Sequence, residues 1–146
     1  MQTPCGLVTL LTDFGLGDPF VGVMKGVLFQ ADPALRVIDL THGIGPGAVT
    51  EGAFWLERSY RHFPQGSVHV GVVDPGVGSE RAAVVVSAER HFFVGPDNGL
   101  LAEITLNPKT SYMHSRARPG FEDAAAMSED TVRRYASEVL NIRVHT

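Results

Sequence analysis

The sequence of 146 residues has a single cysteine, Cys5, and lacks any apolar run near the roughly 20 residues that a membrane-spanning helix requires. One cysteine cannot form an intramolecular disulfide, and such sparing use is typical of a reducing compartment. No positively charged segment precedes the first apolar run, as a secretory signal would require. We therefore expect a cytoplasmic protein that does not act at a membrane.

Basic residues are too few for a general attraction to polyanions. The chain has 12 lysines and arginines against 16 aspartates and glutamates, and its formal net charge is −4. This balance disfavours nonspecific binding to nucleic acid or to anionic lipid. With 44% hydrophobic residues, the chain is long enough to bury a core without metal or disulfide support. We expect one globular chain whose partners are small molecules or proteins.

Several motifs of enzyme sites are missing as well. The chain has no GxGxxG, GxxxxGK[ST] or GxSxG stretch, which disfavours nicotinamide, P-loop and nucleophile-elbow chemistry. Its histidines never pair as HxxxH, and the spacing of Asp39 and His42 matches no metal motif. We therefore predict no metal and no cofactor, and we interpret His42 as a turn residue bonded to backbone.

Glycine and proline, by contrast, gather in four clusters, and each cluster follows an apolar run. The clusters occupy residues 13–17, 43–47, 74–78 and 95–99. Open α/β sheets present ligand-binding residues in this way, on tight loops that follow buried strands. The four loops are therefore where we expect functional residues.

The apolar pattern predicts alternating strands and helices. Strands are expected at residues 6–12, 36–41, 67–73, 81–88 and 91–94, and helices at residues 19–30, 50–62 and 128–140. Glu89 and Arg90 are expected to form the turn between the last two strands. This alternation predicts an α/β fold, a mainly parallel sheet with flanking helices and with ligand residues at the carboxyl ends of its strands.

Two helix starts and one helix face can be predicted more closely. Asp18, followed by proline, is a typical N-cap, and Thr50 is expected to cap the second helix. Ala53, Phe54 and Leu56 are the expected buried face of that helix.

The loops carry carboxylates that have two interpretations each. Asp13 follows the first strand, and its two oxygens could accept hydrogen bonds from adjacent hydroxyls, as on a ribose, or close an Asx turn. Asp18 is either an N-cap alone or part of a helix start beside a ligand. Asp97 and Asn98 again place a carboxylate and an amide in a turn.

Asp74 and Arg81 are the most informative pair. Asp74 ends a strongly apolar strand and Arg81 begins the next, so the returning chain could bring them together. A carboxylate beside a guanidinium stays ionised. The pair is either an ion pair that fastens the loop, or a group in which Asp74 orients or deprotonates a nucleophilic water while Arg81 fixes the carboxylate.

Six ordered segments carry a resemblance to a known family. They are LLTDFG from Leu10 with Asp18, GVMKG from Gly22, DLTH from Asp39, FPQG from Phe63, VVDPGVG from Val72 with Arg81, and GPDNGLL from Gly95. Together they resemble the S-adenosylmethionine hydroxide adenosyltransferase family, which comprises S-adenosylmethionine hydrolases related to fluorinase and chlorinase. The resemblance covers roughly residues 6–103.

The resemblance implies that water or hydroxide attacks the ribose C5′ of S-adenosylmethionine and releases adenosine and methionine. In the family pattern Asp13 accepts the two ribose hydroxyls, Asp18 lies near the methionine, and Asp74 with Arg81 orients the water. In the family pattern, the fluorinating relatives carry a phenol at the position of Asp74. The carboxylate of this chain at that position therefore implies hydrolysis rather than halogenation. We also predict that Asn98 binds substrate.

His114 is the predicted third catalytic residue. It stands in a Met-His-Ser-Arg stretch that echoes the family's histidine motif, and a surface loop histidine is the alternative interpretation.

The resemblance implies a two-domain protein, of which this sequence contains one domain. We predict an α/β S-adenosylmethionine-binding domain at residues 1–106 and a divergent or truncated tail of loop plus helix at residues 107–146. In the family a C-terminal β-barrel, absent here, holds the adenine, and the site forms between subunits of a trimer. The chain is then a fragment, a single-domain member completed by another chain, or a degenerate member. A non-catalytic nucleoside-binding or oligomerisation module is the alternative function.

Overall fold

A single mixed sheet organises the chain. The computed structural model describes residues 3–75 and 83–106 and, as backbone only, residues 111–114. The sheet has six strands within these ranges, in the order β2-β1-β3-β5-β4-β6. Their bounds are β1 Leu7–Thr12, β2 Arg36–Thr41, β3 Val68–Val72, β4 Ala83–Ala88, β5 His91–Pro96 and β6 Ser111–His114.

Five of the six described strands, all except β4, run in the same direction. β1 pairs with β2 and β3 in parallel, and β3 pairs with β5 in parallel, whereas β4 is antiparallel to both β5 and β6. The predicted mainly parallel α/β sheet is therefore confirmed. The carboxyl ends of β1, β2, β3 and β5 lie at one edge of the sheet, which we call the carboxyl edge, and the opposite edge is the amino edge.

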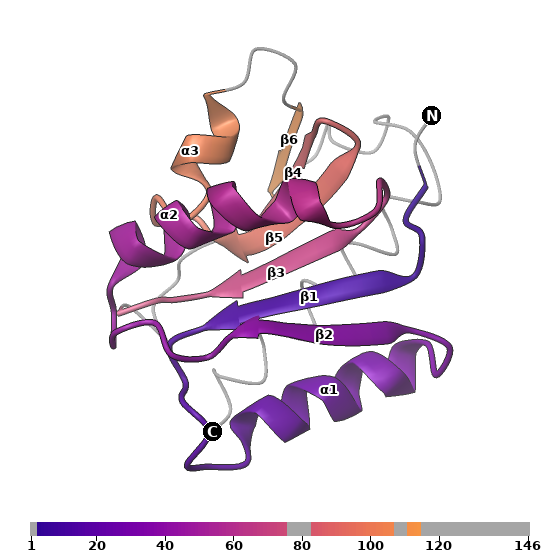
Figure 1. Ribbon diagram of the computed structural model, residues 1–146, viewed down its shortest axis with the longest axis vertical. Coiled ribbons are helices and arrows are strands. Elements are labelled where there is room, and N and C mark those ends of the chain that lie inside the picture. Colours follow the sequence, from indigo (N-terminus) through magenta and orange to yellow (C-terminus); the bar gives the residue numbers. More distant parts are fainter. Residues whose placement is uncertain (1–2, 76–82, 107–110, 115–146) are drawn as a thin grey trace.

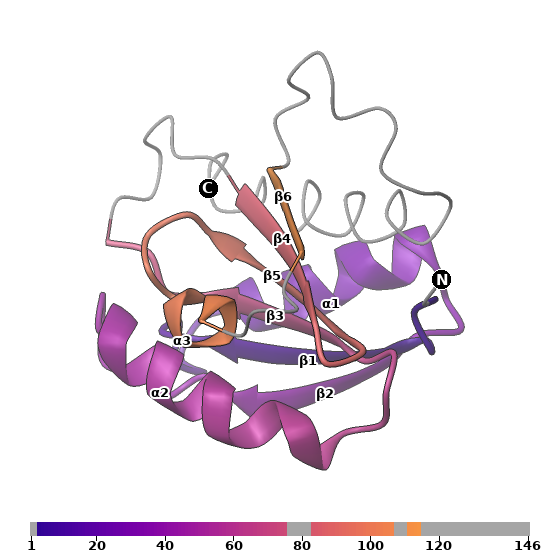
Figure 2. The same ribbon diagram turned by 90° about the horizontal axis from the view of Figure 1, so that it is seen from above.

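Helices cover both faces of the sheet (Figures 1 and 2). They are α1 Phe20–Ala31, α2 Val49–Ser59 with the 3-10 turn η1 Tyr60–His62, and α3 Ala102–Thr105. The chain leaves β1 through α1 towards β2 and returns through α2 to β3 on the other side of β1. The order of the strands thus reverses between β1 and β3, and ligands of open α/β sheets bind at such switch points.

Two apolar cores lie on the two faces. The core on the α1 face includes Val8, Leu10, Met24, Leu28, Val70 and Val94. The core on the α2 face includes Leu11, Leu56, Tyr60, Val86, Phe93 and Leu100. Because side chains of a strand alternate between faces, β1 contributes to both cores, and both β1 and β3 are buried along their whole length. Burial of each large aliphatic side chain stabilises the fold by about 1.5–3 kcal/mol.

The helix starts differ from the predictions in detail. α1 begins at Phe20, one residue later than expected, although Asp18 Oδ1 does accept the Phe20 N–H at 3.0 Å. Thr50 does not cap α2, because the helix already begins at Val49 with Ala48 in the N-cap position. A backbone turn starts this helix instead, in which the Ala48 N–H donates to the Gly45 carbonyl at 2.8 Å.

Phe54 was expected in the buried face of α2, and this prediction is wrong. Its side chain is 44% exposed, whereas Gly52, Ala53 and Leu56 face the sheet. A Cβ atom on Gly52 would lie 2.8 Å from Leu100 Cδ1. The inward position therefore belongs to a residue without a side chain, which lets α2 approach the sheet closely.

The predicted turn between β4 and β5 is confirmed. Glu89 and Arg90 have φ angles of 48° and 64°, as in the two-residue turns that suit the twist of a hairpin. Beyond it, α3 and strand β6 were not predicted, and β6 extends the sheet past residue 106. The expected helix at 128–140 and the first two residues of the strand predicted at 81–88 lie outside the described residues.

Candidate functional site

The predicted site residues gather at the carboxyl edge of the sheet. Asp13 follows β1, Asp74 follows β3 and Asn98 follows β5. β1 and β3 are the two strands of the switch point, so Asp13 and Asp74 flank the position where open α/β sheets hold ligands. The polar residues singled out in the sequence thus come from neighbouring strands.

Asp13 is held by a residue of β3 and by a residue of the loop after β2. Its backbone N–H donates to the Val72 carbonyl at 3.4 Å, and the Gly47 N–H donates to Asp13 Oδ2 at 2.8 Å. The second bond joins the loop after β1 to the loop after β2, so the carboxylate contacts more than its own turn. A carboxylate oxygen can accept further hydrogen bonds, and adjacent hydroxyls remain suitable partners.

Gly47 also brings the Asp13 and Asp74 loops together. Its φ angle is +69°, and a Cβ atom there would lie 3.2 Å from Pro75 Cβ, the residue after Asp74. Glycine at position 47 permits both the left-handed backbone and this close approach. Asp74 itself is half-buried.

Asn98 supports the end of β3. Its Nδ2 donates to the Val73 carbonyl at 2.8 Å, and its Oδ1 accepts the Leu100 N–H at 3.1 Å. Val73 directly precedes Asp74, so the amide fixes the backbone from which that carboxylate projects. An amide carries two donor hydrogens and two lone pairs, so these bonds do not exhaust it.

Asp18 lies at the far end of the loop that Asp13 begins. It is exposed, and one oxygen accepts the Phe20 N–H as described above. The rings of Phe14 and Phe20 meet edge to face with centroids 6.2 Å apart, which closes the loop over residues 14–20. Its predicted role near the methionine stays a prediction.

Of the other two predicted catalytic residues, the structure describes only the backbone of His114. Arg81 lies outside the described residues. His114 ends β6 and therefore lies in a strand rather than in a loop. Its backbone is in register with Val84 of β4, and Val84 is in register with Gly95 near the end of β5. His114 therefore lies in the row of residues near the carboxyl edge.

A hydrogen-bonded network beside Asp13 was missed from the sequence. Thr12 Oγ1 lies 2.7 Å from His42 Nδ1, His42 Nε2 lies 2.8 Å from Asp39 Oδ1, and Lys25 Nζ donates to Asp39 Oδ2 at 2.8 Å. The expectation that the His42 side chain bonds to backbone is wrong, because its partners are side chains. The DLTH segment was the available signal, since its acid and imidazole stand three residues apart.

The charge of Asp39 follows from these contacts. Partial burial raises the pKa of Asp39, but hydrogen bonds from His42 and Lys25 outweigh this effect, and the net pKa lies below its ordinary value. Asp39 is therefore ionised at neutral pH and forms an ion pair with Lys25.

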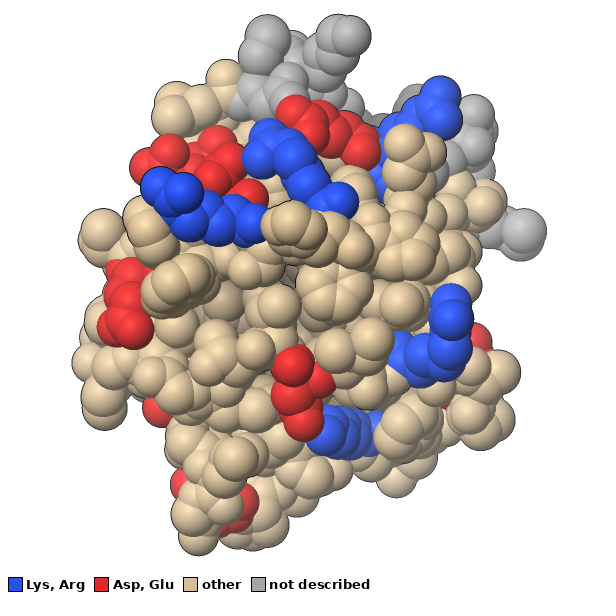
Figure 3. Space-filling view, in the orientation of Figure 1, with Lys and Arg blue, Asp and Glu red and all other residues tan. Residues whose placement is uncertain are grey.

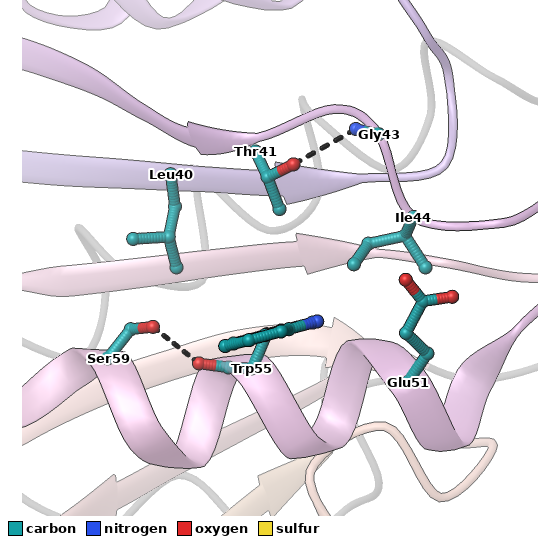
Figure 4. Close-up of a pocket in the computed structure, with 7 residues that line it drawn as sticks. All are labelled: Leu40, Thr41, Gly43, Ile44, Glu51, Trp55 and Ser59. Carbon is teal, nitrogen blue, oxygen red and sulfur yellow. Dashed lines mark hydrogen bonds between the residues drawn. The ribbon is translucent and has the colours of Figure 1, made fainter.

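Two hollows border this region. One, of about 240 Å³, lies between β2 and α2, where Trp55 and Glu51 of α2 face Leu40 and Ile44 (Figure 4). The other, of about 340 Å³, lies at the carboxyl edge near Asp97. In the parts of the chain that the structure describes, no three His, Cys, Asp or Glu side chains are grouped to hold a metal ion.

Acidic and basic side chains are interspersed on the face in Figure 3, and large areas carry neither. No helix among the described residues has the length and apolar character to span a membrane.

Comparisons with known proteins identify relatives. The model of the SAM hydroxide adenosyltransferase N-terminal domain matches residues 8–135. An (R)-S-adenosyl-L-methionine hydrolase of Salinispora arenicola is 47% identical over 96 residues, which are 66% of this chain and 36% of that protein. A fluorinase of Actinoplanes sp. is more distant, at 22% identity over 121 residues, with 67% of this chain and 41% of that protein covered.

A solved structure has the same fold. A crystal structure of an uncharacterized conserved protein from Thermotoga maritima superposes with a TM-score of 0.73 and 30% identity, over 92% of this chain and 54% of that one. The chain thus spans about a third to a half of the length of these relatives. Since the family model matches most of the sequence, the chain belongs to the SAM hydroxide adenosyltransferase N-terminal domain family.

Proposed function

We propose that this chain is the S-adenosylmethionine-binding part of a hydrolase that forms adenosine and methionine. The observation that carries the proposal is the junction at the switch point, where the Gly47 N–H holds Asp13 and Gly47 packs against the residue after Asp74. It places two carboxylates on the loops where this fold binds ligands. The identity to a named S-adenosyl-L-methionine hydrolase supports the choice of substrate.

The proposed reaction divides the work among the site residues. Asp13 accepts hydrogen bonds from the two ribose hydroxyls, and Asp18 and Asn98 contact the substrate. Asp74 orients the water that attacks C5′ and accepts the proton that the water loses as the C5′–O bond forms. The electrons of the broken C5′–S bond leave with sulfur as a neutral thioether, so no acid is needed for the leaving group. The enzyme then has to position the reactants in line, which is where most of its rate enhancement arises.

Arg81 and His114 complete the proposed catalytic group. The proposal for Arg81 rests on its sequence position and on the ability of a guanidinium to keep the Asp74 carboxylate ionised. The proposal for His114 is supported by the position of its backbone near the carboxyl edge.

Hydrolysis is preferred over halogenation in this proposal. An ionised Asp74 beside the nucleophile would repel a halide ion but would accept a hydrogen bond from water. The greater identity to the hydrolase than to the fluorinase supports the same preference.

We further propose that the site is completed outside this chain. The chain covers 36% of the hydrolase, and small-molecule sites bury most of the ligand surface, so the isolated chain is expected to hydrolyse S-adenosylmethionine poorly. A trimer, in which a neighbouring subunit supplies the adenine pocket, would complete it. We propose a cytoplasmic location, because the sequence has only a single cysteine. We also propose that the reaction needs no cofactor.

The test measures adenosine released from S-adenosylmethionine by the purified chain. Asp74→Asn removes the charge with little change of shape and is expected to lower the rate by about 100-fold, the usual contribution of a positioned base. Asp32→Asn is the matched control, because Asp32 caps the end of α1 at the amino edge. Because the isolated chain is expected to be slow, both rates are compared with the uncatalysed background. An equal rate above that background for the Asp74 variant and the wild type would contradict the proposed hydrolase.

Calorimetry with adenosine separates the hydrolase from the alternative module. Adenosine binding that is lost in Asp13→Ala, without any turnover of S-adenosylmethionine, would identify a non-catalytic nucleoside-binding module. Absence of both binding and turnover would contradict both functions.

A further inference from the structure

The hydrogen bonds among Thr12, His42, Asp39 and Lys25, which we call the DLTH network, can all be made with donation in one direction along the chain of side chains. Thr12 Oγ1 accepts the Phe14 N–H at 3.2 Å, so its single hydrogen is available for His42 Nδ1. His42 Nε2–H then donates to Asp39, whose other oxygen accepts from Lys25. A neutral imidazole with its hydrogen on Nε2 matches every one of these contacts.

The network runs from the interior to the surface. Thr12 is fully buried and the His42 side chain is 3% exposed, whereas the side chains of Asp39 and Lys25 are 40% and 31% exposed. Its inner bonds are therefore shielded from competing water and hold a fixed geometry. Well-packed apolar side chains would stabilise such a position at least as well, so stability alone does not account for a polar network there.

The same segments hold the backbone around Asp13. The Gly15 N–H donates to the His42 carbonyl at 2.8 Å, and the Ile44 N–H donates to the Thr12 carbonyl at 3.4 Å. Asp13 therefore lies between two residues that the His42 segment fixes. The Gly47 N–H, three residues beyond Ile44, reaches the Asp13 carboxylate itself.

Lys25 extends this support to the other end of the loop. It lies in α1, which begins just after Asp18, and it contacts Asp39 of β2. The network thus joins β1, where the loop with Asp13 begins, to the helix at which the loop ends.

We propose that Thr12, His42 and Asp39 are positioning residues that set the direction of the Asp13 carboxylate for the vicinal hydroxyls of a nucleoside. This inference rests on the proposed function for its ligand. By this inference, the DLTH network strengthens the binding of nucleosides that carry both sugar hydroxyls and does not affect nucleosides that lack them.

The experiment compares adenosine with 2′,3′-dideoxyadenosine, which lacks both hydroxyls, by calorimetry on the full chain. Thr12→Val removes the hydroxyl and keeps the shape, and Thr12→Ser keeps the hydroxyl as the matched control. We expect Thr12→Val to weaken adenosine binding by about tenfold, the value of one well-aligned hydrogen bond, with dideoxyadenosine unchanged. Thr12→Ser is expected to bind both as the wild type does. An equal effect of Thr12→Val on the two nucleosides, or no effect, would overturn the inference.

A measurement without ligand keeps the two proposals distinguishable. If the network holds Asp13, the Gly47 amide that bonds to its carboxylate should exchange its hydrogen faster in Thr12→Val than in Thr12→Ser. If the wild type does not bind adenosine, the proposed function fails, and amide exchange alone decides this inference. Unchanged exchange would overturn it. If Thr12→Val does not fold, Asp39→Asn replaces it in both measurements, because it alters the exposed end of the DLTH network.

Discussion

Two threonines of strand β1 each lie at hydrogen-bond distance from a histidine, but the two histidines have different surroundings. Thr9 Oγ1 lies 2.7 Å from His69 Nδ1, and Thr12 Oγ1 lies 2.7 Å from His42 Nδ1. Because 9 and 12 differ by an odd number, the two threonines face opposite sides of the sheet. One pair lies towards the amino edge and the other ends the strand at the carboxyl edge.

The pair towards the amino edge is enclosed by apolar and aromatic groups. His69 is fully buried, its Nε2 lies 3.1 Å from His91 Nδ1, and its ring stacks on Phe93 with centroids 5.2 Å apart. Burial lowers the pKa of His69 to about 3, with a further contribution from His91. Burial also lowers the pKa of His91, although the Glu89 carboxylate partly opposes this effect.

The pair at the carboxyl edge leads to a carboxylate, a lysine and solvent. The same hydrogen bond between a threonine and a histidine therefore has two different roles in this sheet. Where the histidine contacts another histidine among aromatic rings, it is part of the core and stays neutral. Where it contacts an ionised aspartate beside the loop that carries Asp13, it connects that loop to the rest of the fold.

The largest expected effect is a loss of stability in acid that arises at His69. Its folded pKa lies below the unfolded value of 6.5, so the unfolded chain binds a proton that the folded chain excludes. The contribution is fully present above pH 6.5 and is lost as the pH falls towards about 3, by up to about 5 kcal/mol. Urea titrations of the unfolding free energy at several pH values measure it.

The variant that tests this prediction replaces the pair by apolar groups, as Thr9→Val with His69→Phe. We expect its stability to fall less steeply between pH 6.5 and 4 than that of the wild type. His62→Asn is the control, because His62 is exposed on η1 and its loss should leave the slope unchanged. If the paired variant and the wild type have the same slope, the acid sensitivity arises elsewhere.

An intermediate effect should separate the two threonines directly. Thr9→Val and Thr12→Val each leave a buried histidine nitrogen without its partner, at a cost of about 1–3 kcal/mol in unfolding free energy. Only Thr12→Val should also weaken adenosine binding. Parallel urea titrations and calorimetry on the two variants measure both quantities, and a weaker adenosine affinity in Thr9→Val would remove the distinction between the pairs.

The sequence was most informative where structure is local. The strand Arg36–Thr41 was predicted with its observed bounds, because a short β-branched run stands between turn residues. The turn at Glu89 and Arg90 also follows from a local pattern. The placement of Asp13, Asp74 and Asn98 at one edge needed only the alternation of strands and helices, since parallel strands end at the same edge.

What could not be predicted depends on contacts between distant segments. The DLTH network joins a helix, an edge strand and a central strand, and no spacing in the sequence reveals that Thr12 meets His42. The histidines at 69 and 91 lie in apolar strands and pair only in the folded sheet. The start of α2 was missed for a similar reason, because a backbone turn through Gly45 takes the place of a side-chain cap.

The smallest expected effect lies at the exposed end of the DLTH network. Lys25→Met removes the ion pair with Asp39, whose partners are 31% and 40% exposed, and such surface pairs contribute about 0.2–1 kcal/mol. The loss should shrink in 1 M salt, where the Debye length is about 3 Å. Urea titrations at low and high salt measure it, with Arg36→Met, at the exposed start of β2, as the control. A cost above about 2 kcal/mol would mean that the outer end of the network is as tightly coupled to the fold as the buried Thr9–His69 pair, and the contrast between the two edges would then fail.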